Sequence, residues 1–224
     1  MGAYTALDEL CSHMPADSLI EMLLDRASER PAEVAECARR SYHHALGCEK
    51  IMLMVGSGSS TLRVHVWRPS DVPTHAAEHV HNHRFEFASA VLCGSMTMEV
   101  FSLDPSGGSM EAYAESIGED GETWVMRPHG SERLRKTMHM RLAAGTLYQM
   151  DAGSLHRTAN GSSVCTVTLF LEAWAGPGRP RTDVYSRVGA GAPSEFRRSP
   201  MRPDEYLVTL AGVRSLLATN GGAS

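Results

Sequence analysis

Histidines gather in one short stretch of this chain and recur once downstream of a glycine-rich turn. His79, His81 and His83 occupy every second position, and His156 follows Gly153 by three residues. Because side chains alternate sides along an extended strand, histidines at this spacing point to one face. Imidazole suits transition metals, whereas Mg and Ca prefer oxygen ligands. The pattern predicts a metal pocket built on β-strands.

Short β-rich runs broken by Gly, Ser, Pro and Asp occupy the middle of the chain. The predicted strands are 51–55, 61–67, 87–93, 96–102, 124–126, 138–142, 145–150 and 164–174. Many short strands with frequent turns are typical of an antiparallel sandwich or barrel. We expect hairpin turns at 103–110 and 117–122, where glycines cluster.

Helical patterns flank this β-rich region. Pro15 and Pro31 open predicted helices, the second of which ends at Gly47, and Pro203 opens a final helix. Residues 175–202 are rich in Pro, Gly and Arg and predict an irregular wrap. We therefore expect a mainly β fold in one structural domain, with a helical extension (1–48), a β-barrel (49–174) and a wrap with a C-terminal helix (175–224).

Composition narrows the choice of partners. The net charge is -5, and only Lys50 and Lys136 are lysines, so nothing draws the chain to nucleic acid or an acidic membrane. The five cysteines contain no C-x-x-C pair, which argues against a disulfide framework or a thiolate zinc site. No signal peptide or long apolar run stands out. We expect a cytoplasmic protein with a small-molecule substrate, and a homodimer stays open.

The downstream histidine belongs to a longer pattern. Gly145, Gly153, His156 and Asn160 have the spacing of the second motif of the cupin superfamily, which this sequence resembles. Asp151 replaces the proline of the family motif at a turn position that Asp tolerates. The resemblance covers about 61 to 174. It implies a cupin β-barrel, also called a double-stranded β-helix or jelly roll, with His156 as a metal ligand.

The first cupin motif can be aligned in two registers. Counting back from Gly94 assigns His81 and His83 as ligands and puts Phe87 at the position where the family has Glu. Counting from His79 and His81 assigns Glu86 instead, but stretches the gap to Gly94 by one residue. We prefer the first register, because a strand that ends at a tight glycine turn tolerates insertion poorly. The second register, with His79 in place of His83, stays open.

Three neutral ligands leave coordination positions vacant, as in catalytic sites. The resemblance implies Fe(II), with Zn, Ni or Mn as alternatives. A competing interpretation is a histidine-rich surface loop that picks up metal adventitiously, and the second motif argues against it.

Other polar and aromatic residues are candidates for substrate binding and proton transfer. Arg63, His65 and Trp67 share one strand face, and Phe170 lies on a later strand; these four are substrate-binding candidates. The acid-base candidates are Glu86, Tyr148 and Glu172.

Strand alternation makes two further predictions about side-chain direction. In the last β run, an apolar row that includes Val167 and Leu169 alternates with a mixed row that includes Phe170 and Glu172. Which row lines the barrel stays open. Alternation should turn Arg84 and Arg157 away from the pocket, because each follows a candidate ligand.

Three-histidine cupins include thiol dioxygenases, which this sequence resembles loosely. Those enzymes carry a His and a Tyr late in the last β run, whereas Phe170 and Glu172 stand nearest here. Thiol dioxygenation is therefore not expected. The leading hypothesis is a mononuclear Fe(II) oxygenase or dioxygenase acting on a small polar metabolite. The alternatives are a redox-neutral Zn, Ni or Mn enzyme for cyclisation, elimination or isomerisation, and a non-enzymatic small-molecule-binding cupin.

Overall fold

The computed structural model describes residues 2–44, 47–56, 60–69, 79–159, 164–172, 178–190 and 194–220. In that part of the chain the helices are α1 (Ala3–His13), α2 (Ala16–Asp25), α3 (Pro31–Arg39) and α4 (Pro203–Asn220). None of them is long and apolar enough to span a membrane.

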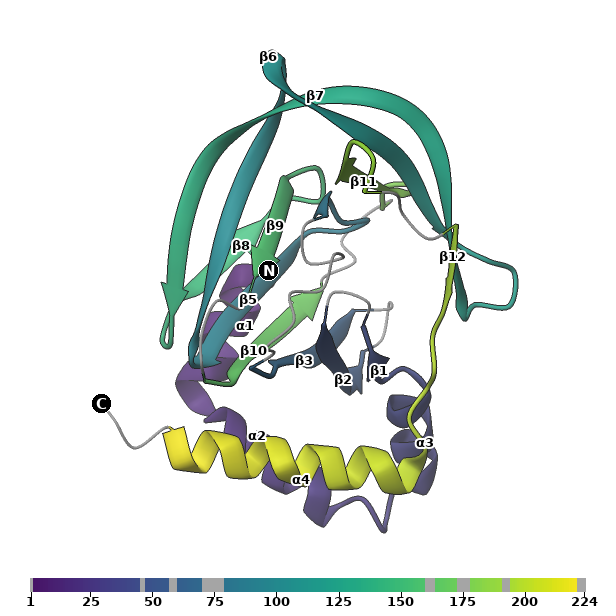
Figure 1. The fold of residues 1–224 in the computed structure, drawn as a ribbon. Coiled ribbons are helices and arrows are strands. Elements are labelled where there is room, and N and C mark those ends of the chain that lie inside the picture. The colour runs from purple at the N-terminus through teal and green to yellow at the C-terminus, as the bar shows by residue number, and fades with distance from the viewer. Residues whose placement is uncertain are drawn as a thin grey trace.

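Two antiparallel sheets form the body of the molecule (Figure 1). The first sheet has the order β1 (Tyr42–His43), β2 (Cys48–Val55), β3 (Thr61–Trp67), β10 (Thr166–Glu172), β5 (Phe87–Cys93) and β8 (Leu147–Met150). The second has the order β11 (Thr182–Arg187), β4 (Val80–His81), β9 (Leu155–Ala159), β6 (Ser95–Ile117), β7 (Thr123–Ala143) and β12 (Glu195–Arg197). This arrangement confirms the predicted mainly β fold, with two antiparallel sheets and helices at both ends.

The helices cover the outer face of the first sheet. Val167 and Leu169 of β10 belong to the largest apolar cluster, together with Leu7 of α1, Ile20 of α2 and Leu210 of α4. Burying such aliphatic side chains removes much apolar surface from water and fixes the helices on the sheet. Figure 1 shows α4 along this side of the molecule, while the long β6–β7 hairpin arches over the opposite side.

The other row of β10 faces the interior of the barrel. The Phe170 ring stacks on Phe87 of β5 at a centroid distance of 4.4 Å and lies 5.9 Å from the His83 ring. The apolar row is therefore the one under the helices, and the mixed row lines the interior.

Three boundaries differ from the sequence predictions. Residues 103–110 are part of β6, with a register irregularity between Leu103 and Gly108 where that strand pairs with β7. Helix α3 ends at Arg39 and not at Gly47. Just beyond its end, the Ser41 hydroxyl donates to the Cys37 carbonyl and accepts from the Met52 amide of β2. The supposed wrap contains β11 and β12, and β11 pairs with both β4 and β6.

Two glycine turns lie close together: Gly94 follows β5, and Gly145 precedes β8. Gly94 has φ +75° and Gly145 has φ +85°, in the left-handed region that glycine adopts without strain. The Gly145 amide donates to the Val91 carbonyl, and the Ala144 amide donates to the Gly94 carbonyl. These two bonds tie the turn after β5 to the turn before β8.

Candidate metal centre

Three histidines converge from two neighbouring strands and the segment that follows one of them. One ligand atom from each of His81, His83 and His156 lies within 4.8 Å of the others. His81 on β4 and His156 on β9 are direct cross-strand partners. The His83 ring stacks nearly parallel to the His156 ring, with centroids 5.2 Å apart. The described residues form no other such group of three possible ligands.

Asn82 anchors the segment between the two upstream histidines. Its side-chain amide donates to a carboxylate oxygen of Asp183 at 2.9 Å, and its carbonyl oxygen accepts from the Asp183 amide at 2.8 Å. Arg179 and Arg181 each pair with that carboxylate. Because both the nitrogen and the oxygen of the Asn82 side chain are hydrogen-bonded to Asp183, the segment is fixed with His81 and His83 on the same side.

The imidazoles are held in the neutral form that metals require. Burial, followed by the charge of His156, lowers the pKa of His81 to about 3. The same causes lower the pKa of His83 well below its usual range, and burial lowers that of His156. All three rings therefore offer lone pairs at neutral pH.

Backbone carbonyls orient two of these rings. Nδ1 of His156 lies 3.0 Å from the Ser154 carbonyl oxygen, and Nδ1 of His81 lies 3.4 Å from the His79 carbonyl oxygen. A ring that donates Nδ1–H to a carbonyl presents Nε2 as the ligand atom. Three neutral nitrogen donors fit Fe(II), Zn, Ni or Mn better than the oxygen-seeking Mg and Ca.

An aromatic wall stands where the cupin pattern has a carboxylate. Phe87 lies with its ring centroid 4.5 Å from His83 and 5.8 Å from His156. Glu86, the acidic alternative, is neither in the three-histidine group nor among the described residues that line the adjoining cavity. His79 lines the cavity but lies outside the group.

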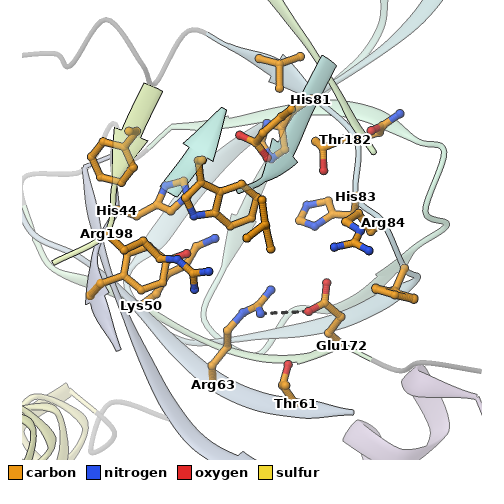
Figure 2. A pocket seen from close by; sticks show the side chains of 18 of the residues that line it. His44, Lys50, Thr61, Arg63, His81, His83, Arg84, Glu172, Thr182 and Arg198 are labelled. Atoms are coloured by element: carbon orange, nitrogen blue, oxygen red, sulfur yellow. Dashed lines mark hydrogen bonds and ion pairs between the residues drawn. The ribbon is translucent and has the colours of Figure 1, made fainter. Parts of the chain in front are cut away.

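Two of the three histidines, His81 and His83, border a cavity of about 350 Å³. His81 and His83 line it together with Arg63 and Glu172, and an ion pair of 3.1 Å joins the last two (Figure 2). The Arg63 guanidinium also stacks over the Phe170 ring at 4.3 Å. Arg63 is thus at the cavity as expected, but Glu172 already neutralises it.

The remaining predicted residues pack behind the cavity wall. His65 is buried, and its Nε2 accepts a hydrogen bond from Nε of Arg63 at 3.2 Å. Trp67 is buried in a separate apolar cluster, and Tyr148 packs against that cluster. Burial raises the pKa of Tyr148. The structure does not bring Trp67 or Tyr148 to the lining of the cavity.

The prediction for Arg84 was wrong, whereas Arg157 does turn away. Arg84 lines the cavity, because β4 ends at His81 and strand alternation stops there. Arg157 lies within β9 and pairs with Glu99 on the neighbouring strand β6.

Sequence reasoning missed a further set of lining residues. Lys50, Glu115, Trp124 and Arg198 come from β2, β6, β7 and the segment after β12. Burial raises the pKa of Glu115. Lone polar residues in four separate segments carry no local signal, so only the fold reveals them.

No family model and no curated protein sequence matches the chain. Among solved structures, it resembles hydroquinone 1,2-dioxygenase from Sphingomonas sp. TTNP3, at 10% identity and a TM-score of 0.35 over 57% of this chain and 66% of that chain. It also resembles FeII HppE, at 11% identity and a TM-score of 0.35 over 57% of this chain and 51% of that chain. A cupin domain from Bordetella pertussis Tohama I matches at 13% identity and a TM-score of 0.32, over 58% of this chain and 95% of that chain. The chain thus spans less than two thirds of the dioxygenase and about half of HppE.

Proposed function

We propose that this protein is a metal-dependent cupin enzyme whose metal is bound by His81, His83 and His156. The observation that carries the proposal is the convergence of three neutral imidazoles within 4.8 Å of one another, two of which, His81 and His83, line a cavity. A purely structural metal site would be closed by a fourth protein ligand, whereas this donor set leaves positions for substrate.

The leading chemistry is that of a mononuclear Fe(II) oxygenase or dioxygenase acting on a small polar metabolite. Fe(II) in such a site supplies oxygen activation and a template for the substrate. The protein's own part is to orient the substrate and exclude water: the buried rings of Phe87 and Phe170 pack beside His83, behind the residues that line the cavity. The ion pair with Glu172 holds the Arg63 guanidinium in place, so Arg63 offers a fixed hydrogen-bond donor to the cavity.

A redox-neutral enzyme with Zn, Ni or Mn is the second candidate, and the lining carboxyl groups favour it. Burial raises the pKa of Glu115, so this carboxyl holds a proton more readily than an exposed one does. Glu172 lines the same cavity. These two residues would serve as the acid and base of a cyclisation, elimination or isomerisation.

Metal content and oxygen consumption together test these alternatives. Protein purified without added metal should contain close to one equivalent of iron and consume O2 with a substrate from a panel of small polar metabolites. His156→Ala should lose the iron. Stoichiometric zinc with turnover independent of oxygen would select the redox-neutral enzyme, and absence of any stoichiometric transition metal would refute both.

A further inference from the structure

Unpaired hydrogen-bond donors gather at the side of the cavity away from His83. Figure 2 shows Lys50 and Arg198 on one side of the cavity and His83 and Arg84 on the other. Nε1 of Trp124 and Nε of Arg198 are buried and have no hydrogen-bond partner among the described residues. A buried donor without a partner destabilises the fold, so such a group points to a ligand that satisfies it.

Ring contacts join these donors into one cluster. The Arg198 guanidinium lies 5.2 Å from the Trp124 ring centroid and 5.1 Å from that of Tyr42. The Lys50 ammonium lies 6.0 Å from the same Tyr42 ring. Two cations therefore share one aromatic neighbour, and we call Lys50, Trp124 and Arg198 the anion end of the cavity.

Positive charge exceeds negative charge along the cavity wall. The lining cations are Arg40, Lys50, Arg63, Arg84 and Arg198, and the lining carboxylates are Glu115 and Glu172. Arg40 is neutralised by Glu36 and Arg63 by Glu172. Lys50, Arg84 and Arg198 have no ion pair with any described residue, so three cations face one unpaired acid, Glu115.

The charge of Lys50 affects the pKa of two neighbouring groups, His44 and Glu115. After burial, it is the largest cause that lowers the pKa of His44, and it opposes the rise in the pKa of Glu115. Two like charges around Tyr42 repel each other in a partly buried wall, where their interaction is stronger than in water. An anion between them would relieve that repulsion.

We propose that the anion end binds an oxyanion group of the substrate, a carboxylate or a phosphate, while the substrate's other end reaches the three histidines. The substrate class is thus a small bifunctional anion. Lys50 would supply charge, and Nε1 of Trp124 and Nε of Arg198 would each donate a hydrogen bond to an oxyanion oxygen. The second half of this statement rests on the proposed function, whereas oxyanion binding at the anion end does not.

Indole NMR signals of the full chain test the anion end directly. The sequence has three tryptophans, so Trp124→Phe assigns the Trp124 Nε1–H signal by its disappearance. Inorganic phosphate and acetate are titrated separately, and acetamide serves as the neutral control. We expect a saturable shift of the Trp124 signal with at least one anion and none with acetamide. Tighter phosphate binding would assign a phosphate group, and tighter acetate binding a carboxylate.

The two lysines of the chain provide a matched pair of variants. Lys50→Met should weaken anion binding about tenfold or more, as expected for losing a charged partner. Lys50→Arg should largely restore it, and Lys136→Met on β7 should leave it unchanged. An absent shift, an equal shift with acetamide, or unchanged affinity in Lys50→Met would overturn the inference.

Metal analysis on the same samples separates this inference from the proposed function. Anion binding by a chain that takes up no stoichiometric metal would refute the metal site alone. Stoichiometric metal without any anion-dependent shift of Trp124 would refute the anion end alone.

Discussion

His81 and His156 stand directly opposite each other on β4 and β9, with ring centroids 4.8 Å apart. Cross-strand neighbours on one face are held at a nearly constant separation by the backbone ladder. The spacing between these two candidate ligands is therefore set by main-chain pairing, and His83 completes the group from the irregular segment that follows β4.

The histidine register gives the first prediction. His83→Ala should lower metal affinity at least a hundredfold, because it removes a direct ligand, whereas His79→Ala should change it less than threefold. Competition with a metal chelator measures both variants. Metal loss in His79→Ala with retention in His83→Ala would establish the other register.

The Asn82–Asp183 contact gives the second prediction. Asp183→Ala should lower metal affinity by about tenfold, since it removes the carboxylate that accepts from the Asn82 side chain, while the bond from the Asp183 main-chain amide to Asn82 remains. Asp104→Ala is the matched control: Asp104 also pairs with an arginine, Arg135, but on the exposed β6–β7 hairpin. Equal metal affinity in the two variants would show that the contact does not position the ligands.

The turn at Gly94 gives the third prediction. A Cβ there would lie 2.4 Å from the Cys165 carbonyl oxygen, in addition to the cost of φ +75°. At Gly145, with φ +85°, a Cβ would meet nothing within 4 Å. Gly145→Ala should therefore lose only about 1–2 kcal/mol of unfolding free energy, and Gly94→Ala clearly more. Urea unfolding compares them, and an equal loss would contradict the close approach to Cys165.

Acid stability gives the fourth prediction. Glu99 accepts hydrogen bonds from Lys136, Arg157 and His139, which outweigh burial and lower its pKa from 4.5 to about 2. A lowered carboxyl pKa stabilises the fold above pH 4.5, and that contribution is lost as the pH falls from 4.5 towards 2.

Glu99→Gln isolates that contribution. It should cost about 1–2 kcal/mol of unfolding free energy at neutral pH, allowing for the exposure of Lys136 and His139, and little near pH 2. Unfolding free energies measured across this range check it. A pH-independent difference between the variant and the parent chain would mean that Glu99 acts through packing alone.

The barrel and most of its strands were predictable from sequence because their signals are local. β3 and β5 have the predicted bounds, and α4 begins at Pro203 as expected. The three converging histidines were likewise predictable from motif spacing, although His83 lies beyond the end of β4. The predicted match at Asn160 lies outside the described residues.

The missed elements are short or stabilised from a distance. β4 is two residues long and is held by β9 and β11, so its own sequence carries no strand signal. β11 looked irregular because Arg and Pro precede it, yet pairing with β6 over six residues makes it a strand. For the same reason Arg84, just past the end of β4, escaped the alternation rule. Tertiary pairing, and not local propensity, decides such segments.

The position of β4 also dictates when the metal centre can form during synthesis. His81 is made early, but its partners His156 on β9 and Val184 on β11 leave the ribosome much later. Contacts between residues far apart in sequence form late, since the intervening chain must first be closed into a loop. A nascent chain that ends before β11 thus lacks the contacts of Asp183 and Val184 with the segment that carries His81 and His83. Metal should therefore bind late, near the end of synthesis, once β11 has paired with β4.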